Sequence, residues 1–174
     1  MGEAHGYLRD ARGRVTTIDV PGVLTTLAWR INNRGQSIGQ AFDSADPANS
    51  HYTFLRERDG TFTRLPDVPG AVQTIHIGLN NRGQTAATAA FLSADGTFVT
   101  LRAFRYDNGE RTRIAVPGAV STFATAINDR GHIVGYYTDP APGTTRPPPA
   151  AAADGAAGMP MGLDPLAMTD PMLP

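Results

Sequence analysis

Short runs in which apolar and polar residues alternate recur along the first 138 residues, and none shows the 3.6-residue spacing of an amphipathic helix. In the middle of the chain these runs are TFLRE, TFTRLPDV and TIHIGL. Asp59-Gly60, Asp95-Gly96 and Asn108-Gly109 separate such runs, and dipeptides of this kind are typical of β-hairpin turns. The pattern therefore predicts an all-β domain of short strands joined by tight turns.

A block of residues occurs three times, starting at Val20, Val68 and Val116, so that successive copies begin 48 residues apart. Each copy holds a Val-Pro-Gly sequence, a Thr, and an Asn-Asn-Arg-Gly or Asn-Asp-Arg-Gly sequence. The structural positions shared by the copies are Pro21, Gly22, Thr26, Gly35, Pro69, Gly70, Thr74, Gly83, Pro117, Gly118, Thr122 and Gly131. We expect four strands per unit with Pro-Gly between the second and the third, as in TFLRE, TFTRLPDV, TIHIGL and QTAATAA. A repeat of this length with four strands per unit is typical of a β-propeller blade. We expect three four-stranded, propeller-like repeats; a β-solenoid and a three-layer stack are the alternatives.

The repeated residues have predictable local roles. Pro-Gly is expected to end a strand, because proline cannot donate to the ladder and glycine permits a positive φ. The Asn-Asn-Arg-Gly block predicts a type I turn with a bulge at its glycine, and the Thr is expected to bond the backbone near Pro-Gly. The strand after the Asn-Asn-Arg-Gly block has a small residue at its middle in every copy, namely Gly39, Ala87 and Gly135. We interpret this as close backbone approach at a crowded axis.

The repeats combine HGYLRD with TTIDVPG, followed by INNRGQ and IG. Over residues 5–138 this combination resembles the HAF repeat family of bacterial extracellular repeat proteins. The resemblance implies a tandem β-repeat, often exported, without an assigned enzymatic activity, and it carries over no catalytic residue. The chain differs from the family in its few repeats, its Ala/Pro-rich end, and a start, MGEAHGYLRD, without the apolar segment of a secretory signal. An extracellular location is implied by the resemblance alone, and these differences leave open a cytoplasmic protein, export by another route and a truncated repeat array.

The composition divides the chain in two. Residues 139–174 hold nine of the fourteen prolines and four of the five methionines, and no aromatic residue follows Tyr137. Such a segment buries too little surface to order itself. We expect a repeat domain over 1–138 and a disordered Pro/Ala/Met-rich tail over 139–174, whose Met and Leu side chains are available to a partner's groove.

The charge and composition exclude several classes of function. The net charge is −1 and all fifteen basic residues are arginine without a basic cluster, which argues against nucleic-acid binding. No apolar run is long enough to cross a membrane, and the lack of cysteine excludes disulfides and thiolate sites. No G-x-S-x-G, H-E-x-x-H or phosphate-binding glycine motif occurs. The sequence predicts no catalytic residue, no metal and no cofactor.

One arginine recurs in the same turn of every copy, as Arg34, Arg82 and Arg130. Aligned guanidinium groups are suited to an anion- or carboxylate-binding rim. The alternative, which we favour, is that each pairs with a neighbouring unit's carbonyls or with an acid such as Asp19 or Asp67. Residues repeated in every unit usually serve the repeat itself.

Histidines and an acidic loop are the other candidates for chemistry. His5, His51, His76 and His132 lack an adjacent acid and nucleophile, so we expect structural or surface roles for them. The loop 43–50 carries oxygen ligands suited to calcium, but its spacing is not that of an EF-hand. A polar loop between units is the favoured interpretation.

These observations favour a non-enzymatic repeat protein that provides a binding or assembly surface. The alternative is a propeller-type carbohydrate- or small-ligand-binding protein, or a hydrolase or lyase, with its site between blades. Three blades are too few to close a ring, and the two ends of the repeat region carry complementary hairpins. We therefore expect self-association into a homodimer or larger assembly, with a protein or glycan as the other possible partner.

Overall fold

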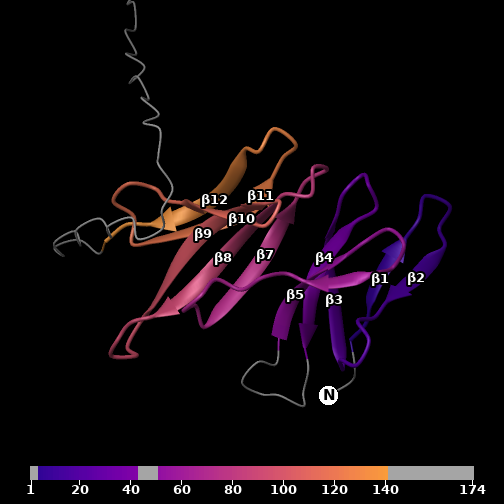
Figure 1. Ribbon diagram of the computed structural model, residues 1–174, viewed down its shortest axis with the longest axis horizontal. Coiled ribbons are helices and arrows are strands. Elements are labelled where there is room, and N and C mark those ends of the chain that lie inside the picture. Colours follow the sequence, from indigo (N-terminus) through magenta and orange to yellow (C-terminus); the bar gives the residue numbers. More distant parts are fainter. Residues whose placement is uncertain (1–3, 43–50, 141–174) are drawn as a thin grey trace, which may run out of the picture.

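The computed structural model describes residues 4–42 and 51–140, in which all the regular elements are β-strands paired in antiparallel fashion (Figure 1). The loop at 43–50 and the tail from 141 onward, on which two of the sequence predictions fall, lie outside these residues. The strands are β1 (Gly6–Arg9), β2 (Val15–Ile18), β3 (Thr25–Ile31), β4 (Ser37–Phe42), β5 (His51–Arg56), β6 (Phe62–Arg64), β7 (Gln73–Leu79), β8 (Thr85–Leu92), β9 (Val99–Asp107), β10 (Glu110–Ile114), β11 (Ser121–Ile127) and β12 (Ile133–Thr138).

The strands form two four-stranded sheets with a two-stranded hairpin at either end. The complete sheets have the orders β3-β4-β5-β6 and β7-β8-β9-β10, and the hairpins are β1-β2 and β11-β12. In Figure 1 the indigo β1-β2 hairpin and the orange β11-β12 hairpin lie at opposite ends, with the two sheets between them. The all-β, antiparallel prediction is confirmed. Within the described residues, β1 pairs with β2 and β12 with β11, and the strands do not close into a ring.

The boundaries between sheets differ from the sequence interpretation. That interpretation placed the hairpins before and after each Pro-Gly in one unit, whereas the structure joins β3-β4 to β5-β6 and breaks the sheet between β6 and β7. The break falls at Val68-Pro69-Gly70, where the Ala71 N–H donates to the Val68 carbonyl at 3.0 Å and closes a tight turn. Pro-Gly therefore carries the chain from one sheet to the next.

The repeated threonine holds this turn in place. The Thr74 hydroxyl accepts the Val68 N–H at 2.8 Å, and the Thr26 hydroxyl accepts the Val20 N–H at 3.1 Å. At these two positions the predicted bond to the backbone near Pro-Gly is confirmed. Each bond ties the strand after the turn to the residue before it, which fixes the angle at which the next sheet begins.

The Asn-Asn-Arg-Gly turns have the predicted conformation. Gly35, Gly83 and Gly131 have φ angles of 79°, 82° and 81°, in the left-handed region that disfavours side chains. The side chain of Asn32 caps its turn, because its Oδ1 accepts the N–H groups of Arg34 and Gln36 at 3.0 Å. The same bonds recur at Asn80 and Asn128.

The small residues in the middle of β4 and β12 lie where two backbones approach closely, as expected. A β-bulge in β3 shifts the register between Ala28 and Arg30, and it brings the Leu27 carbonyl against the opposite strand. A Cβ atom added at Gly39 would lie 1.9 Å from that oxygen, and one at Gly135 would lie 1.8 Å from the Phe123 oxygen. The predicted close backbone approach is therefore confirmed at Gly39 and Gly135, and it is to the partner strand of the same hairpin rather than at an axis between units.

The core is divided into three small clusters along the array. Their buried members are Ile18, Val20, Ala41 and Phe54; Val68, Ala87, Ala89, Phe104 and Tyr106; and Ala86, Ala103, Ala124 and Ile127. Each cluster draws residues from neighbouring hairpins or sheets, so stability is built up from contacts between adjacent units, as in other repeat proteins. In the part of the chain that the structure describes, no helix has the length and apolar character needed to span a membrane.

Candidate functional site: the repeat turns and the two free ends

A directional ladder of asparagines connects the repeat turns. Asn32 Nδ2 donates to the Asn80 carbonyl at 2.9 Å, and Asn80 Nδ2 donates to the Asn128 carbonyl at the same distance. Beside it, the N–H groups of Asn33 and Asn81 donate at 2.7 Å to the side chains found 48 residues later. The first and second turns therefore each donate to the turn that follows.

A second set of polar bonds joins the hairpins within each complete sheet. Gln36 Nε2 donates to the two carboxylate oxygens of Glu57 at 3.0 and 3.1 Å, and Gln84 Nε2 donates to Asp107 at 2.6 Å. Gln84 is only 5% exposed. Charge-assisted bonds at buried sites are strong, so each glutamine secures the outer hairpin to the inner one.

The repeated arginines lie exposed at these turns. Arg34 Nη1 approaches the Asn81 carbonyl of the next turn at 3.5 Å, which fits the predicted pairing with a neighbouring unit's carbonyl. The amide donors of Asn81, and after them the charge of Arg82, hold the pKa of Asp129 below its usual value.

The acids suggested as partners for the repeated arginines are held elsewhere. Asp67 pairs with Arg64 at 2.9 Å, and Asp19 accepts from His5 at 2.9 Å. In the described part of the chain, the one contact that the structure gives for these guanidinium groups, that of Arg34, is thus with a carbonyl of the next turn. The side chains of both acids are used within or beside their own hairpin.

His76 is the histidine with the most distinctive surroundings. It is 1% exposed, its Nδ1 lies 2.8 Å from the Thr85 hydroxyl, and its Nε2 lies 3.1 Å from the Pro66 carbonyl. Because a carbonyl only accepts, Nε2 carries the proton and Nδ1 accepts from Thr85. Burial lowers the pKa of His76 to about 4, so the ring is neutral at pH 7. The ring packs 4.6 Å from that of Tyr106, and its two nitrogens hold the region between β6 and β8 together.

The remaining histidines have different surroundings. His5 contacts Asp19, the His51 ring lies 5.9 Å from that of Phe42, and His132 is exposed at the last turn. Over residues 4–42 and 51–140, no cluster of three or more His, Cys, Asp or Glu side chains suited to a metal ion is present.

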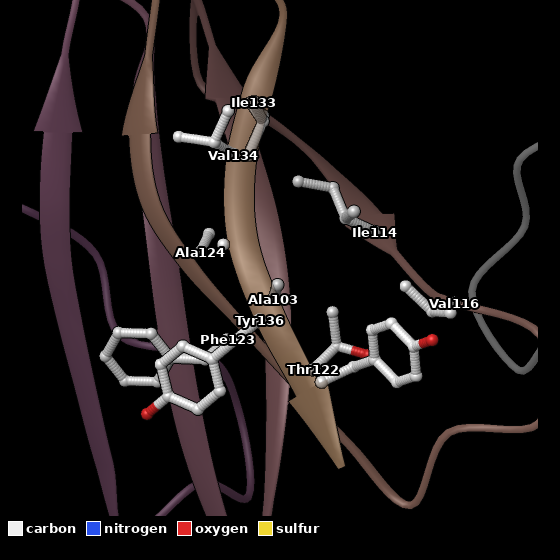
Figure 2. Close-up of a pocket in the computed structure, with 11 residues that line it drawn as sticks. Ala103, Ile114, Val116, Thr122, Phe123, Ala124, Ile133, Val134 and Tyr136 are labelled. Atoms are coloured by element: carbon white, nitrogen blue, oxygen red, sulfur yellow. The ribbon is translucent and has the colours of Figure 1, made fainter. Parts of the chain in front are cut away.

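The β11-β12 end of the array carries an open apolar groove. Its volume is about 320 Å³, and Figure 2 shows aliphatic side chains of Ile114, Val116 and Ile133 around it, beside the stacked rings of Phe123 and Tyr136. Val134, Tyr136 and Tyr137 are exposed by 63%, 55% and 51%. Strand β12 pairs with β11 on one side, and among the described residues its other edge has no strand partner.

The β1-β2 end carries a second groove, of about 250 Å³. Tyr7, Leu8, Ile18, Trp29 and Ile31 are among its lining residues. Tyr7 is 68% exposed and Ile31 is 59% exposed. Sequence reasoning singled out Thr122 and Gly135 of the first groove for structural reasons, and it did not identify either groove as a site. The available signal was the repeat alignment, in which Tyr137 stands where Ala41 and Ala89 stand in the other copies.

Comparison with known proteins leaves the chain without an assigned family. No family model matches it, and no curated protein matches it. A solved structure titled "Streptogramin B lyase structure" is similar over 78% of this chain and 62% of that chain, with a TM-score of 0.32 and 16% identity. A similarity this low assigns neither fold nor activity. The class of the protein, all-β with several antiparallel sheets, rests on its strand topology.

Proposed function

We propose that the protein is a non-enzymatic β-repeat module that acts by association, through a binding or assembly surface at the ends of its sheet array. The observation that carries the proposal concerns residues 4–42 and 51–140: there, both ends combine a strand edge without a strand partner with an apolar groove. This function agrees with the resemblance to bacterial extracellular HAF repeats.

Two physical arguments support association. An exposed strand edge presents unpaired N–H and C=O groups, which favours pairing with another strand. Exposed aromatic and aliphatic side chains gather at the same place, and burying them would be favourable at roughly 25 cal/mol per Å². Val134, Tyr136 and Tyr137 supply this surface on one end, and Tyr7 supplies part of it on the other.

The propeller-like character is part of the proposal. Each complete sheet is a four-stranded antiparallel meander, and successive sheets are joined by Pro-Gly and by the asparagine ladder. We take these sheets as blades of an open arc. Such an arc leaves its first and last blades incomplete, which is where the grooves lie.

Sedimentation velocity over a wide range of protein concentration tests the proposal. We expect species larger than the monomer to appear as concentration rises, and we expect Val134→Lys to suppress them, because an edge charge opposes strand pairing. Ala94→Lys, at an exposed turn between β8 and β9, is the matched control and should associate normally. A chain that stays monomeric at every concentration and binds nothing on glycan or protein arrays would contradict the proposed function.

A further inference from the structure

We infer that the free edge of β12 is occupied by strand β1 of a second copy of this chain, in the register that the two complete sheets already display. The inference rests on the proposed function and names its partner. The second copy would supply the missing outer hairpin of the β11-β12 sheet as an intact β1-β2 unit.

The register follows from the two complete sheets. Ser37 pairs with Arg56 across β4 and β5, and Thr85 pairs with Tyr106 across β8 and β9. Ile133 is the repeat equivalent of Ser37 and Thr85. Strand β12 is therefore the equivalent of β4 and β8. Within the described residues, its sheet lacks the strand that corresponds to β5 and β9.

Strand β1 matches the missing partner at its turn. The Asp10 N–H donates to the Arg14 carbonyl at 3.0 Å, and the Glu57 N–H donates to the Thr61 carbonyl at 2.8 Å in the same way. Arg9 is thus the equivalent of Arg56. The register places Ile133 opposite Arg9 of the second copy.

The same register places the other residues of the two edges. Val134 falls opposite Leu8, Gly135 opposite Tyr7, and Tyr137 opposite His5 of the second copy. Each of these pairs has an observed counterpart in the complete sheets, at Ile38↔Leu55, Gly39↔Phe54 and Ala41↔Tyr52.

Shape complementarity favours this register. In the complete sheets a small residue faces an aromatic one, as Gly39 faces Phe54 and Ala87 faces Phe104. A Cβ atom at Gly39 would come 2.7 Å from the Phe54 ring, which shows how closely the ring covers the glycine. Phe54 and Phe104 are 0% and 2% exposed, whereas Tyr7 is 68% exposed. In the proposed register the ring of Tyr7 of the second copy lies opposite Gly135, as Phe54 lies opposite Gly39 and Phe104 opposite Ala87. The ring would then be buried like those two rings.

A polar pair completes the match. The glutamines that join the hairpins of the complete sheets, Gln36 and Gln84, donate to Glu57 and Asp107. At the equivalent positions the β11-β12 hairpin has His132 and the β1-β2 hairpin has Asp10. Asp10 Oδ1 accepts the N–H groups of Arg12 and Arg14 within its own turn at 2.9 Å. The proposed register brings the imidazole of His132 beside this carboxylate of the second copy.

In the described residues the β1-β2 hairpin already has β1 as its outer strand. The β1-β2 hairpin already packs on its own next sheet, with the Ala4 carbonyl accepting the Thr26 N–H at 2.9 Å, and its free edge is β1. The asparagine ladder also continues across the junction. Its last turn presents the donor Asn128 Nδ2, and its first turn presents the acceptor Asn32 carbonyl, because each turn donates to the next.

Cysteine cross-linking tests the register, and the chain has no cysteine of its own. A Tyr137→Cys chain is mixed with a His5→Cys chain under mild oxidation, and a Tyr137→Cys chain is mixed with an Arg9→Cys chain as the out-of-register control. All three positions are exposed. Residues opposite each other in an antiparallel pair come close enough for a disulfide, whereas a displacement of four residues moves them apart by about 13 Å.

We expect the first mixture to give a disulfide-linked heterodimer and the second to give none. Equal cross-linking in both mixtures, or none in either, overturns the register. If the wild-type chain still associates in sedimentation in that case, the proposed function survives and only this inference fails. A chain carrying both Tyr137→Cys and His5→Cys that closes within a monomer would show that its own hairpin is the occupant, and it would overturn the role of a second copy.

His132 provides an independent check by sedimentation. His132→Gln restores the residue of the other two copies and should leave association unchanged. His132→Glu places a second negative charge beside Asp10 and should weaken association by up to about fivefold. Equal association of the two variants would contradict the proposed His132–Asp10 contact.

Discussion

The centre and the ends of the array contain equivalent residues in opposite surroundings. Phe54 and Phe104 are buried in the complete sheets, while Tyr7, at the equivalent place, is 68% exposed. Ile38 and Ala86 are fully buried, while Val134 is 63% exposed. Asn80 is 3% exposed in the middle of the ladder, and Asn128 is exposed at its end.

The comparison separates what the repeat encodes locally from what it obtains from neighbours. Turns, bulges and hairpins are the same in the centre and at the ends, because they depend on residues close in sequence. Burial differs because it requires an adjacent hairpin. The end hairpins β1-β2 and β11-β12 therefore have the local structure of the complete sheets, but their equivalent side chains are exposed.

The largest effect is expected for the equivalent aromatic residues. Phe54→Ala should lower the free energy of unfolding by about 3–5 kcal/mol, because it removes a fully buried ring. Tyr7→Ala should change the stability of the isolated chain by only about 0.5 kcal/mol, as is typical of surface positions. Urea unfolding at low protein concentration measures both. Equal losses would show that the β1-β2 end is covered in the monomer.

A pH titration of stability should reveal the buried histidine. The pKa of His76 is about 4 in the folded chain, below the ordinary 6.5, so the unfolded state binds the proton first. Stability is therefore complete above pH 6.5 and falls by about 3 kcal/mol as the pH drops to 4.

His76→Ala supplies the control for that titration, since alanine stands at the equivalent positions Ala28 and Ala124. The variant should be less stable at pH 7 and should lose less stability between pH 6.5 and 4. Denaturant unfolding at a series of pH values makes the measurement. The same pH dependence in both chains would show that His76 is not the titrating group.

The turn glycines should give equal effects at the centre and the end. Gly83→Val and Gly131→Val should each lower the free energy of unfolding by about 1–3 kcal/mol, because a β-branched residue is strained at positive φ whatever its neighbours are. Gly35→Val should behave alike. Thermal melts that show no loss for any of the three would refute the turn assignment.

The asparagine ladder should give the smallest and most specific difference. Asn80 Nδ2 donates to the carbonyl of the next turn, whereas Asn128 stands at the last described turn. Both asparagines cap their own turns. Asn80→Ala should therefore lower the free energy of unfolding by about 1 kcal/mol more than Asn128→Ala does, which is the net value of the additional bond. Denaturant unfolding of the two variants at low concentration tests this. Identical losses would mean that the ladder contributes nothing to stability.

The strands and turns were accessible from the sequence because their signals are local. Asp59-Gly60 and Asn108-Gly109 specify hairpins wherever they occur, and both lie at such turns. The grouping of hairpins into sheets was not accessible, because a Pro-Gly turn within a sheet and one between sheets have the same residues. The division at Gly70 is visible only once the strands are paired.

The candidate site was less accessible than the fold. Tyr7 and Phe54 look alike in the sequence, and their different exposure depends on which hairpins are present beside them. The arginines stood out because they repeat, and the partner of Arg34 is a carbonyl of the next turn rather than Asp19 or Asp67. The burial of His76 depends on β6 and β8 meeting around it, which the alignment of the copies did not reveal.

Hydrogen–deuterium exchange of the wild-type chain at low and high concentration tests the central claim most directly. At low concentration we predict that the outward N–H groups of β12 and β1 exchange rapidly, while those of β4 and β8 are protected by pairing on both sides. At high concentration β12 and β1 should become protected together. Protection of β12 equal to that of β4 and β8 at the lowest concentration, or exchange of β12 and β1 that does not depend on concentration, would contradict the account.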